Sequence, residues 1–151
     1  MTEPAVHSAP TRDLSIEQLY GILRVRAEVF VVEQQTSYLD PDGRDLEPPT
    51  LQFWVEHDGQ VVAALRLLED AESDGSVVKH IGRVVTAPAF RGSGLASRLM
   101  DAALARCGAA DVVLDAQAHL DGWYARFGFE SVSSPYDLDG IAHVHMRRRL
   151  T

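Results

Sequence analysis

The sequence is short of two residues that carry much of the chemistry of enzymes. Among its 151 residues there is one cysteine, Cys107, and one lysine, Lys79. A single cysteine excludes an intramolecular disulfide and a cysteine-rich zinc site, and we expect Cys107 to be a small packing residue at the end of a helix. The P-loop of ATPases and GTPases needs a Gly-Lys-Ser/Thr step. Because Lys79 stands outside any glycine-rich loop, the sequence excludes that motif.

Positive charge and long apolar runs are also scarce. The chain has 14 basic and 22 acidic residues, which give a formal net charge of -8. Without a basic patch we expect no nucleic-acid partner, whereas an amine-bearing partner suits an acidic surface. No stretch reaches the length of a membrane span, so we expect no membrane partner. The first residues lack the basic start and apolar stretch of a secretory signal, and we expect a cytoplasmic protein.

Length and composition favour one domain. With 46% hydrophobic residues in 151, the chain can bury one good core and is too short for two domains of ordinary size. Residues 1–13 are rich in proline, serine and threonine, and we expect them to form a mobile tail. The single domain is then expected over residues 14–150.

Hydrophobic periodicity predicts alternating helices and strands. Ser15 and Gln18 have the spacing of a capping box, and helical spacing continues to Phe30. An Asp-Gly turn at 58–59 separates two apolar runs and predicts a hairpin. The expected strands are 51–56, 61–68, 77–86, 111–116, 128–133 and 141–150, and the expected later helices are 94–106 and 120–127. This order predicts a mixed α/β sheet with helices on its faces.

The stretch TAPAFRGSGLASRLM, residues 86–100, places an arginine and two glycines at the start of an amphipathic helix. The first amides of a helix are unpaired and lie at the positive end of its dipole, so they bind anions. Gly92 and Gly94 let ligand oxygens approach the backbone, and Arg91 adds charge-assisted hydrogen bonds. A dinucleotide-binding loop would need a third glycine where Ser97 stands. The segment therefore predicts a pyrophosphate site.

The same residues resemble a known signature. Residues 91–96, RGSGLA, are similar to the Arg/Gln-x-x-Gly-x-Gly/Ala motif of the GNAT superfamily of acetyl-CoA-dependent N-acetyltransferases. Five further blocks resemble its ElaA-like branch: FVVEQ (30–34), YLDPDGRDL (38–46), IGRVV (81–85), AQAHL with YARFGF (116–129) and DGIAHVHM (139–146). The resemblance implies a single-domain GNAT-type α/β (α+β) fold, with a mixed, mainly antiparallel sheet splayed at the cofactor site and helices on both faces.

The resemblance also implies roles for particular residues. A bulged strand at Val84, Val85 and Thr86 would bind the pantetheine arm and the thioester oxygen of acetyl-CoA. Tyr124, five residues before Phe129, would protonate the departing thiolate, and Gln117 stands where many members carry an asparagine that contacts pantetheine. The pyrophosphate would be held by Arg91, Gly92, Ser93, Gly94, Leu95, Ala96 and Ser97. From spacing alone, Tyr124 is equally an ordinary core aromatic.

Candidates for the base that deprotonates the incoming ammonium are Glu33, His119 and His145, with Glu33 and His119 ranked together ahead of His145. Each has a structural alternative. Glu33 could be an ion-paired end of the first helix, His119 a structural hydrogen-bonding residue, and His145 a strand residue facing water. An ordered water relay would also serve as the base.

The acidic loop DPDGRD, residues 40–45, lacks the closing glutamate of an EF-hand. We therefore expect a solvated turn and no metal site. The alternative is that Asp40, Asp42 and Asp45 border a pocket for an amine.

Together these features predict an acetyl-CoA-dependent N-acetyltransferase that acts on a small-molecule or peptide amine. The alternative is a non-catalytic acyl-CoA sensor or protein-interaction module. The identity of the acceptor and the presence of a homodimer are not readable from the sequence.

Overall fold

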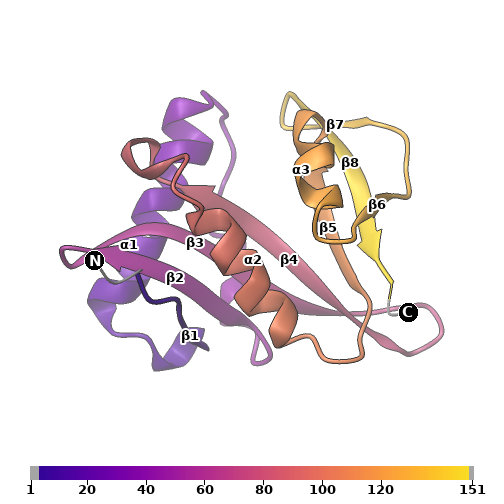
Figure 1. Cartoon of the computed structure of the whole chain (residues 1–151), viewed down its shortest axis with the longest axis horizontal. Coiled ribbons are helices and arrows are strands. Elements are labelled where there is room, and N and C mark those ends of the chain that lie inside the picture. Colours follow the sequence, from indigo (N-terminus) through magenta and orange to yellow (C-terminus); the bar gives the residue numbers. More distant parts are fainter. Residues whose placement is uncertain (1–3, 150–151) are drawn as a thin grey trace.

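Most elements begin where the sequence predicts them in the computed structural model, which describes residues 4–149 (Figure 1). The first helix opens with the expected capping box: the Ser15 hydroxyl accepts from the Gln18 amide at 3.1 Å, and the Gln18 side chain accepts from the Ser15 amide at 2.9 Å. The helices are α1 (Ile16–Arg26), which continues as a π-helix (Ala27–Glu33), α2 (Leu95–Ala105) and α3 (Asp121–Ala125). Among the described residues, no helix is long and apolar enough to cross a membrane.

Within the described part of the chain, eight strands form one sheet. They are β1 (His7–Pro10), β2 (Leu51–His57), β3 (Gln60–Ala71), β4 (Val77–Thr86), β5 (Val112–Gln117), β6 (Glu130–Ser131), β7 (Tyr136–Leu138) and β8 (Ile141–Arg148). Their order is β1-β2-β3-β4-β5-β8-β6, with β7 also paired to β8. β4 and β5 pair in parallel, and the other pairs are antiparallel. The expected mixed, mainly antiparallel sheet is confirmed.

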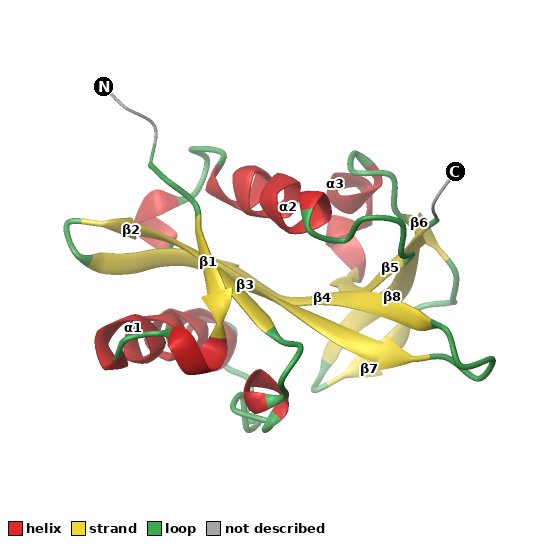
Figure 2. Ribbon diagram, turned by 90° about the horizontal axis from the view of Figure 1, so that it is seen from below, coloured by secondary structure: helices red, strands yellow, loops and turns green. Residues whose placement is uncertain are grey.

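Helices cover both faces of the sheet (Figure 2). α1 and the π-helix that continues it pack on one face, where Ile22, Val25 and Val29 form a cluster with Trp54, Ala64 and Val85. α2 lies on the other face, and its buried side chains join the larger core cluster. Because β3 is covered on both faces, it is buried without interruption from Val62 to Leu68, and Arg66 is the one charged residue in this run.

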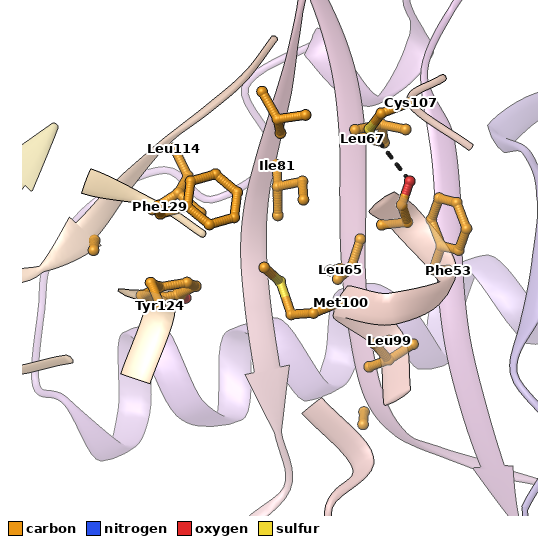
Figure 3. Close-up of a cluster of buried hydrophobic side chains, with 14 of the residues drawn as sticks. Phe53, Leu65, Leu67, Ile81, Leu99, Met100, Cys107, Leu114, Tyr124 and Phe129 are labelled. Carbon is orange, nitrogen blue, oxygen red and sulfur yellow. Dashed lines mark hydrogen bonds between the residues drawn. The ribbon is translucent and has the colours of Figure 1, made fainter. Parts of the chain in front are cut away.

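The large core brings the second half of the chain against the first (Figure 3). Tyr124, Phe129 and Leu114 from the second half belong to the same cluster as Ile81 on β4. Cys107 is buried in this cluster, and its thiol donates to the Ala103 carbonyl at 3.3 Å. The expectation that Cys107 is a packing residue is confirmed.

The prediction of a mobile tail over residues 1–13 is wrong for most of that segment. Residues 7–10 form β1, which pairs antiparallel with residues 51–54 of β2, and a short 3-10 helix follows at Thr11–Asp13. Pro10 is compatible with this because β1 is an edge strand, where proline needs to donate no ladder hydrogen bond. The short strand β7 is a further element that the sequence does not predict. Residues 1–3 and residue 150 of these predictions lie outside the described part of the chain.

Candidate active site

The sheet opens between β4 and β5 because their pairing is short. Parallel register is limited to Lys79 with Val112 and His80 with Val113, although β4 continues to Thr86 and β5 to Gln117. Beyond His80 the two strands separate, as Figure 1 shows. The end of β4 is therefore free on one side.

A β-bulge reshapes β4 at the start of this opening. Ala64 on β3 pairs with Val85, and Arg66 pairs with Gly82, so Arg83 and Val84 together face one residue of β3. Arg83 has a φ of 53°, the left-handed region that a residue with a Cβ rarely adopts. A bulge of this kind turns the strand and changes the direction of its amides.

Two cavities meet at the opening. The larger, of about 590 Å³, is lined by the bulged strand, the segment after β4, the start of α2 and the π-helix, and it contains every sequence-predicted site residue except Ser93 and His145. The smaller, of about 320 Å³, extends toward β5, β7 and β8 and the acidic loop. Six residues line both cavities: Phe30, Gln34, Val84, Gln117, Leu120 and Tyr124.

The start of α2 has the backbone geometry that the glycines predict. Gly92 and Gly94 both have a φ of 81°, and a Cβ built on either would meet no atom within 4 Å. Gly94 is the N-cap of α2, an 11-residue helix whose first amides border the larger cavity. Ser93 turns away from the cavity, and its hydroxyl donates to the Phe90 carbonyl at 2.7 Å. The Ser93 hydroxyl thus ties the loop to Phe90, while the space next to Gly92 and Gly94 is free for a ligand.

Arg91 and Glu33 are ion-paired across the larger cavity. The guanidinium donates to both carboxylate oxygens, at 2.9 and 2.5 Å, and its Nε donates to the Thr86 carbonyl at 3.3 Å. Hydrogen bonds from Arg91 lower the pKa of Glu33 and outweigh the opposing effect of burial. Glu33 is therefore held as an anion at neutral pH.

Tyr124 lies where the two cavities join. Its side chain is 7% exposed and belongs to the large core, with the rings of Trp123 and Phe129 edge-on to it at 4.9 and 6.4 Å. Burial raises the pKa of Tyr124 to about 12. The phenol thus keeps its proton throughout the neutral range while it faces both cavities.

The other candidate residues occupy different places. His119 borders the larger cavity and is exposed. The Gln117 amide donates to the Gln34 side-chain oxygen at 3.2 Å. His145 lies on β8, and its Nδ1 is 2.9 Å from Asp115. Of the three candidate bases, Glu33 and His119 border the larger cavity and none lines the smaller one.

The acidic loop is held in place by buried ion pairs. Asp40 and Asp45 are only 4% and 6% exposed, so the expectation of a solvated turn is wrong for these two residues. Arg26 donates to both of them at 2.8 Å. Asp42 lines the smaller cavity and accepts from Arg66 at 2.9 and 2.7 Å. Their arginine partners lie 14 or more positions away in the sequence, and local turn chemistry could not reveal them. The network consists of Arg26, Asp40, Asp42, Asp45, Arg66 and Arg83.

A second polar cluster at the smaller cavity is absent from the sequence-based predictions. His80 lies between two carboxylates, with Nδ1 2.7 Å from Asp70 and Nε2 3.4 Å from Asp115. Burial alone lowers the pKa of His80, but the hydrogen bonds to Asp115 and Asp70 outweigh it and raise the pKa above its ordinary value. Tyr136 and His145 also contact Asp115. Alternation within β4 and β5 could have placed His80 and Asp115 on one face, but their pairing depends on strand order.

No group of three or more His, Cys, Asp or Glu side chains placed to hold a metal ion occurs among residues 4–149. The polar groups at the opening instead suit an anionic ligand at the α2 start and a hydrogen-bonded one beside the bulge.

Comparison with known proteins gives concordant results. Residues 16–150 match the acetyltransferase (GNAT) domain family. A UPF0039 protein of Mycobacterium tuberculosis is 44% identical over 149 residues, which cover 98% of this chain and 94% of that protein. Protein ElaA of Escherichia coli is 39% identical over 142 residues, with 91% and 92% covered.

Solved structures agree with the sequence relatives. An acyl-CoA N-acyltransferase from Pseudomonas aeruginosa superposes with a TM-score of 0.88 at 41% identity, over 97% of this chain and 99% of that one. The crystal structure of Escherichia coli ElaA gives a TM-score of 0.88 at 35% identity, over 97% and 100%.

Proposed function

Because the chain belongs to the GNAT acetyltransferase family, in its ElaA-like branch, we propose that it transfers the acetyl group of acetyl-CoA directly to a primary amine of a small molecule or peptide. One structural observation gives this proposal its main support. The cavity that contains the predicted cofactor residues and the smaller cavity on the other side of the opening share six lining residues, and Tyr124 is one of them. Two substrates that enter from opposite sides can thus meet beside a protonated phenol.

In this proposal the larger cavity takes acetyl-CoA. Its pyrophosphate lies on the first amides of α2, above Gly92 and Gly94, where the helix dipole and the open backbone favour an anion. The pantetheine arm follows the free side of β4. The Ala87 amide donates to Val62 on the β3 side. Because alternate residues of a strand direct their amides to opposite sides, the Thr86 amide is directed to the opening. In this proposal it binds the pantetheine together with the Val84 amide, which the bulge makes available for the thioester oxygen.

The amine enters through the smaller cavity. Its nitrogen attacks the thioester carbon, a carbon–nitrogen bond forms, and the tetrahedral oxyanion is stabilised by the strand amides. Collapse breaks the carbon–sulfur bond, and the departing thiolate takes the proton of the Tyr124 hydroxyl. Burial raises the pKa of Tyr124 to about 12. The same burial disfavours the thiolate, so that contact in this site makes the proton transfer feasible.

For the base, the contacts favour His119 over Glu33. Glu33 is engaged by Arg91 through two hydrogen bonds, which lower its pKa and its ability to take a proton. His119 borders the larger cavity close in sequence to Gln117 and Leu120, which line both cavities. We propose that His119 accepts the ammonium proton through water.

An acceptor screen tests the proposal. The full chain is incubated with acetyl-CoA and a panel of amino acids, peptides, polyamines and aminoglycosides, and both free CoA and the acetylated amine are measured. The proposal predicts CoA release that depends on one class of amine, with one acetylated product for each CoA released. Tight acetyl-CoA binding without transfer to any amine would instead support a non-catalytic acyl-CoA sensor.

A further inference from the structure

The place of the acyl group follows from the shape of the two cavities and rests on the proposed function. Transfer requires the amine nitrogen to come within about 3–3.5 Å of the thioester carbon. The two substrates occupy different cavities, so the acyl group must lie where the cavities share their lining. Of the shared residues, Phe30, Val84 and Leu120 are apolar, and they can contact the alkyl part of the acyl group.

A hydrogen-bonded pair of glutamines borders this junction. Gln117 is the last residue of β5, and Gln34 caps the π-helix on the opposite side of the opening. The Gln117 amide donates to the Gln34 oxygen at 3.2 Å, and both residues line both cavities. The bond joins segments that lie 83 positions apart in sequence. It thus links two sides of the region where the larger and the smaller cavity share their lining.

We propose that the Gln34–Gln117 pair sets the length of the acyl group that the enzyme accepts. An acetyl group ends at the methyl carbon and leaves the pair intact. A longer chain must either break the hydrogen bond of this part-buried pair and place alkyl carbons against its amide groups, or fold back against Phe30 and Leu120. A chain that broke through would occupy the acceptor cavity and exclude the amine.

With the Gln34–Gln117 pair in place, the affinity for acyl-CoA should change with acyl-chain length in the opposite direction to that of an open channel. In a channel that buries the alkyl chain, each added methylene increases affinity about fourfold. A junction limited by the Gln34–Gln117 hydrogen bond instead makes affinity fall as the chain grows. The ratio of the affinity for hexanoyl-CoA to that for acetyl-CoA therefore reports on the junction alone, because the CoA part of both ligands is identical.

Calorimetric titration of the full chain with acetyl-CoA, butyryl-CoA and hexanoyl-CoA tests this without an acceptor. We expect wild type to bind hexanoyl-CoA at least about tenfold more weakly than acetyl-CoA, because the longer chain must break the hydrogen bond of this part-buried pair. Gln34→Ala should raise the hexanoyl-to-acetyl ratio about tenfold or more and change acetyl-CoA affinity less than about threefold. Gln117→Ala should raise the same ratio, even if its contact with pantetheine weakens both ligands. Gln60→Ala, at an exposed glutamine of the β2–β3 hairpin, is the matched control.

The outcomes separate the two proposals. An unchanged ratio in both glutamine variants, or a wild type that binds hexanoyl-CoA as tightly as acetyl-CoA, overturns the length limit and leaves acyl transfer intact. Failure of wild type to bind any of the three thioesters overturns the proposed function and the length limit together.

Discussion

Arg91 and Glu33 form a two-point ion pair across the larger cavity, with nitrogen–oxygen distances of 2.9 and 2.5 Å. The pair joins a residue that is expected to hold the pyrophosphate and one that is a candidate base for the acceptor amine. Both side chains are 40–45% exposed, so the pair itself contributes little to stability. Its consequence is chemical, because it holds Glu33 as an anion next to the expected place of the pyrophosphate.

The ion pair predicts that Glu33 is dispensable for proton removal. Glu33→Gln should leave kcat within about fivefold of wild type and should not weaken acetyl-CoA binding, since a competitor of the pyrophosphate for Arg91 is removed. His119→Gln should lower kcat by about 10²-fold, the effect of losing a general base. Steady-state kinetics with a good acceptor compares the two. A loss of about 10²-fold or more in Glu33→Gln, with His119→Gln near wild type, would assign the base to Glu33.

The start of α2 predicts a charge-specific effect at Gly94. Aspartate and asparagine have the same shape and both tolerate the left-handed backbone better than most residues, so Gly94→Asp and Gly94→Asn should lose similar stability. The aspartate places a negative charge on the expected pyrophosphate site, and acetyl-CoA affinity should fall at least about tenfold further than in the asparagine variant. Calorimetry measures both affinities. Equal affinities would remove the pyrophosphate from this helix start.

Arg83 predicts a link between the acidic loop and the bulge. Its Nε is 2.8 Å from Asp40, its guanidinium lies over the Tyr38 ring, and its backbone φ is 53°. Glycine adopts this φ freely, so Arg83→Gly removes the side-chain anchor alone, whereas Arg83→Ala also strains the backbone. Arg83→Ala should be less stable than Arg83→Gly by about 0.5–1 kcal/mol. Both should lower kcat by about tenfold or more, because the bulge loses its anchor and the reacting groups lose their alignment. Wild-type turnover in Arg83→Gly would show that the bulge needs no anchor.

The His80 cluster predicts a pH-dependent contribution to stability. The pKa of His80 is raised in the folded protein by Asp115 and Asp70, so its contribution is complete below its unfolded pKa of about 6.5 and is lost as pH rises through the raised value. Hydrogen bonds from His80 first, and from Tyr136 and His145, lower the pKa of Asp115, so the carboxylate side is lost as pH falls below about 4. Arg44 also donates to Asp70, and because arginine stays charged, this pair persists over the whole pH range considered.

Urea unfolding from about pH 4.5 to about pH 9 measures this contribution. The free energy of unfolding of His80→Gln should lie about 1–2 kcal/mol below that of wild type near pH 5.5, and the gap should narrow above about pH 7. His57→Gln, at an exposed histidine, is the control and should show no such change. A gap that widens with rising pH would contradict the assignment of a charged His80.

The sequence predicts those features that depend on local patterns. The capping box at Ser15, the Asp-Gly hairpin and the glycines before α2 each specify a conformation within a few residues, and all three are confirmed. Strand β1 escapes prediction because proline and serine lower strand propensity, whereas pairing with β2 outweighs propensity in the fold.

Local sequence patterns do not predict the whole candidate site. The residues that the GNAT signature predicts to hold the cofactor, apart from Ser93, line one cavity, but the smaller cavity depends on contacts between distant segments. Asp115 meets His80 only because β5 lies beside β4, and Gln34 meets Gln117 across the opening. The buried role of the acidic loop likewise depends on arginines from α1, β3 and β4.

In the proposed mechanism Tyr124, where the two cavities join, gives its proton to the departing thiolate. Tyr124→Phe keeps the buried ring against Trp123 and Phe129 and removes only the hydroxyl, so stability and acetyl-CoA affinity should change little. The direct test is kcat of Tyr124→Phe with a good acceptor, under conditions where chemistry limits the rate. We predict a fall of about 10²–10⁴-fold with acetyl-CoA affinity preserved. A kcat equal to that of wild type would contradict the claim and show that Tyr124 is a core aromatic.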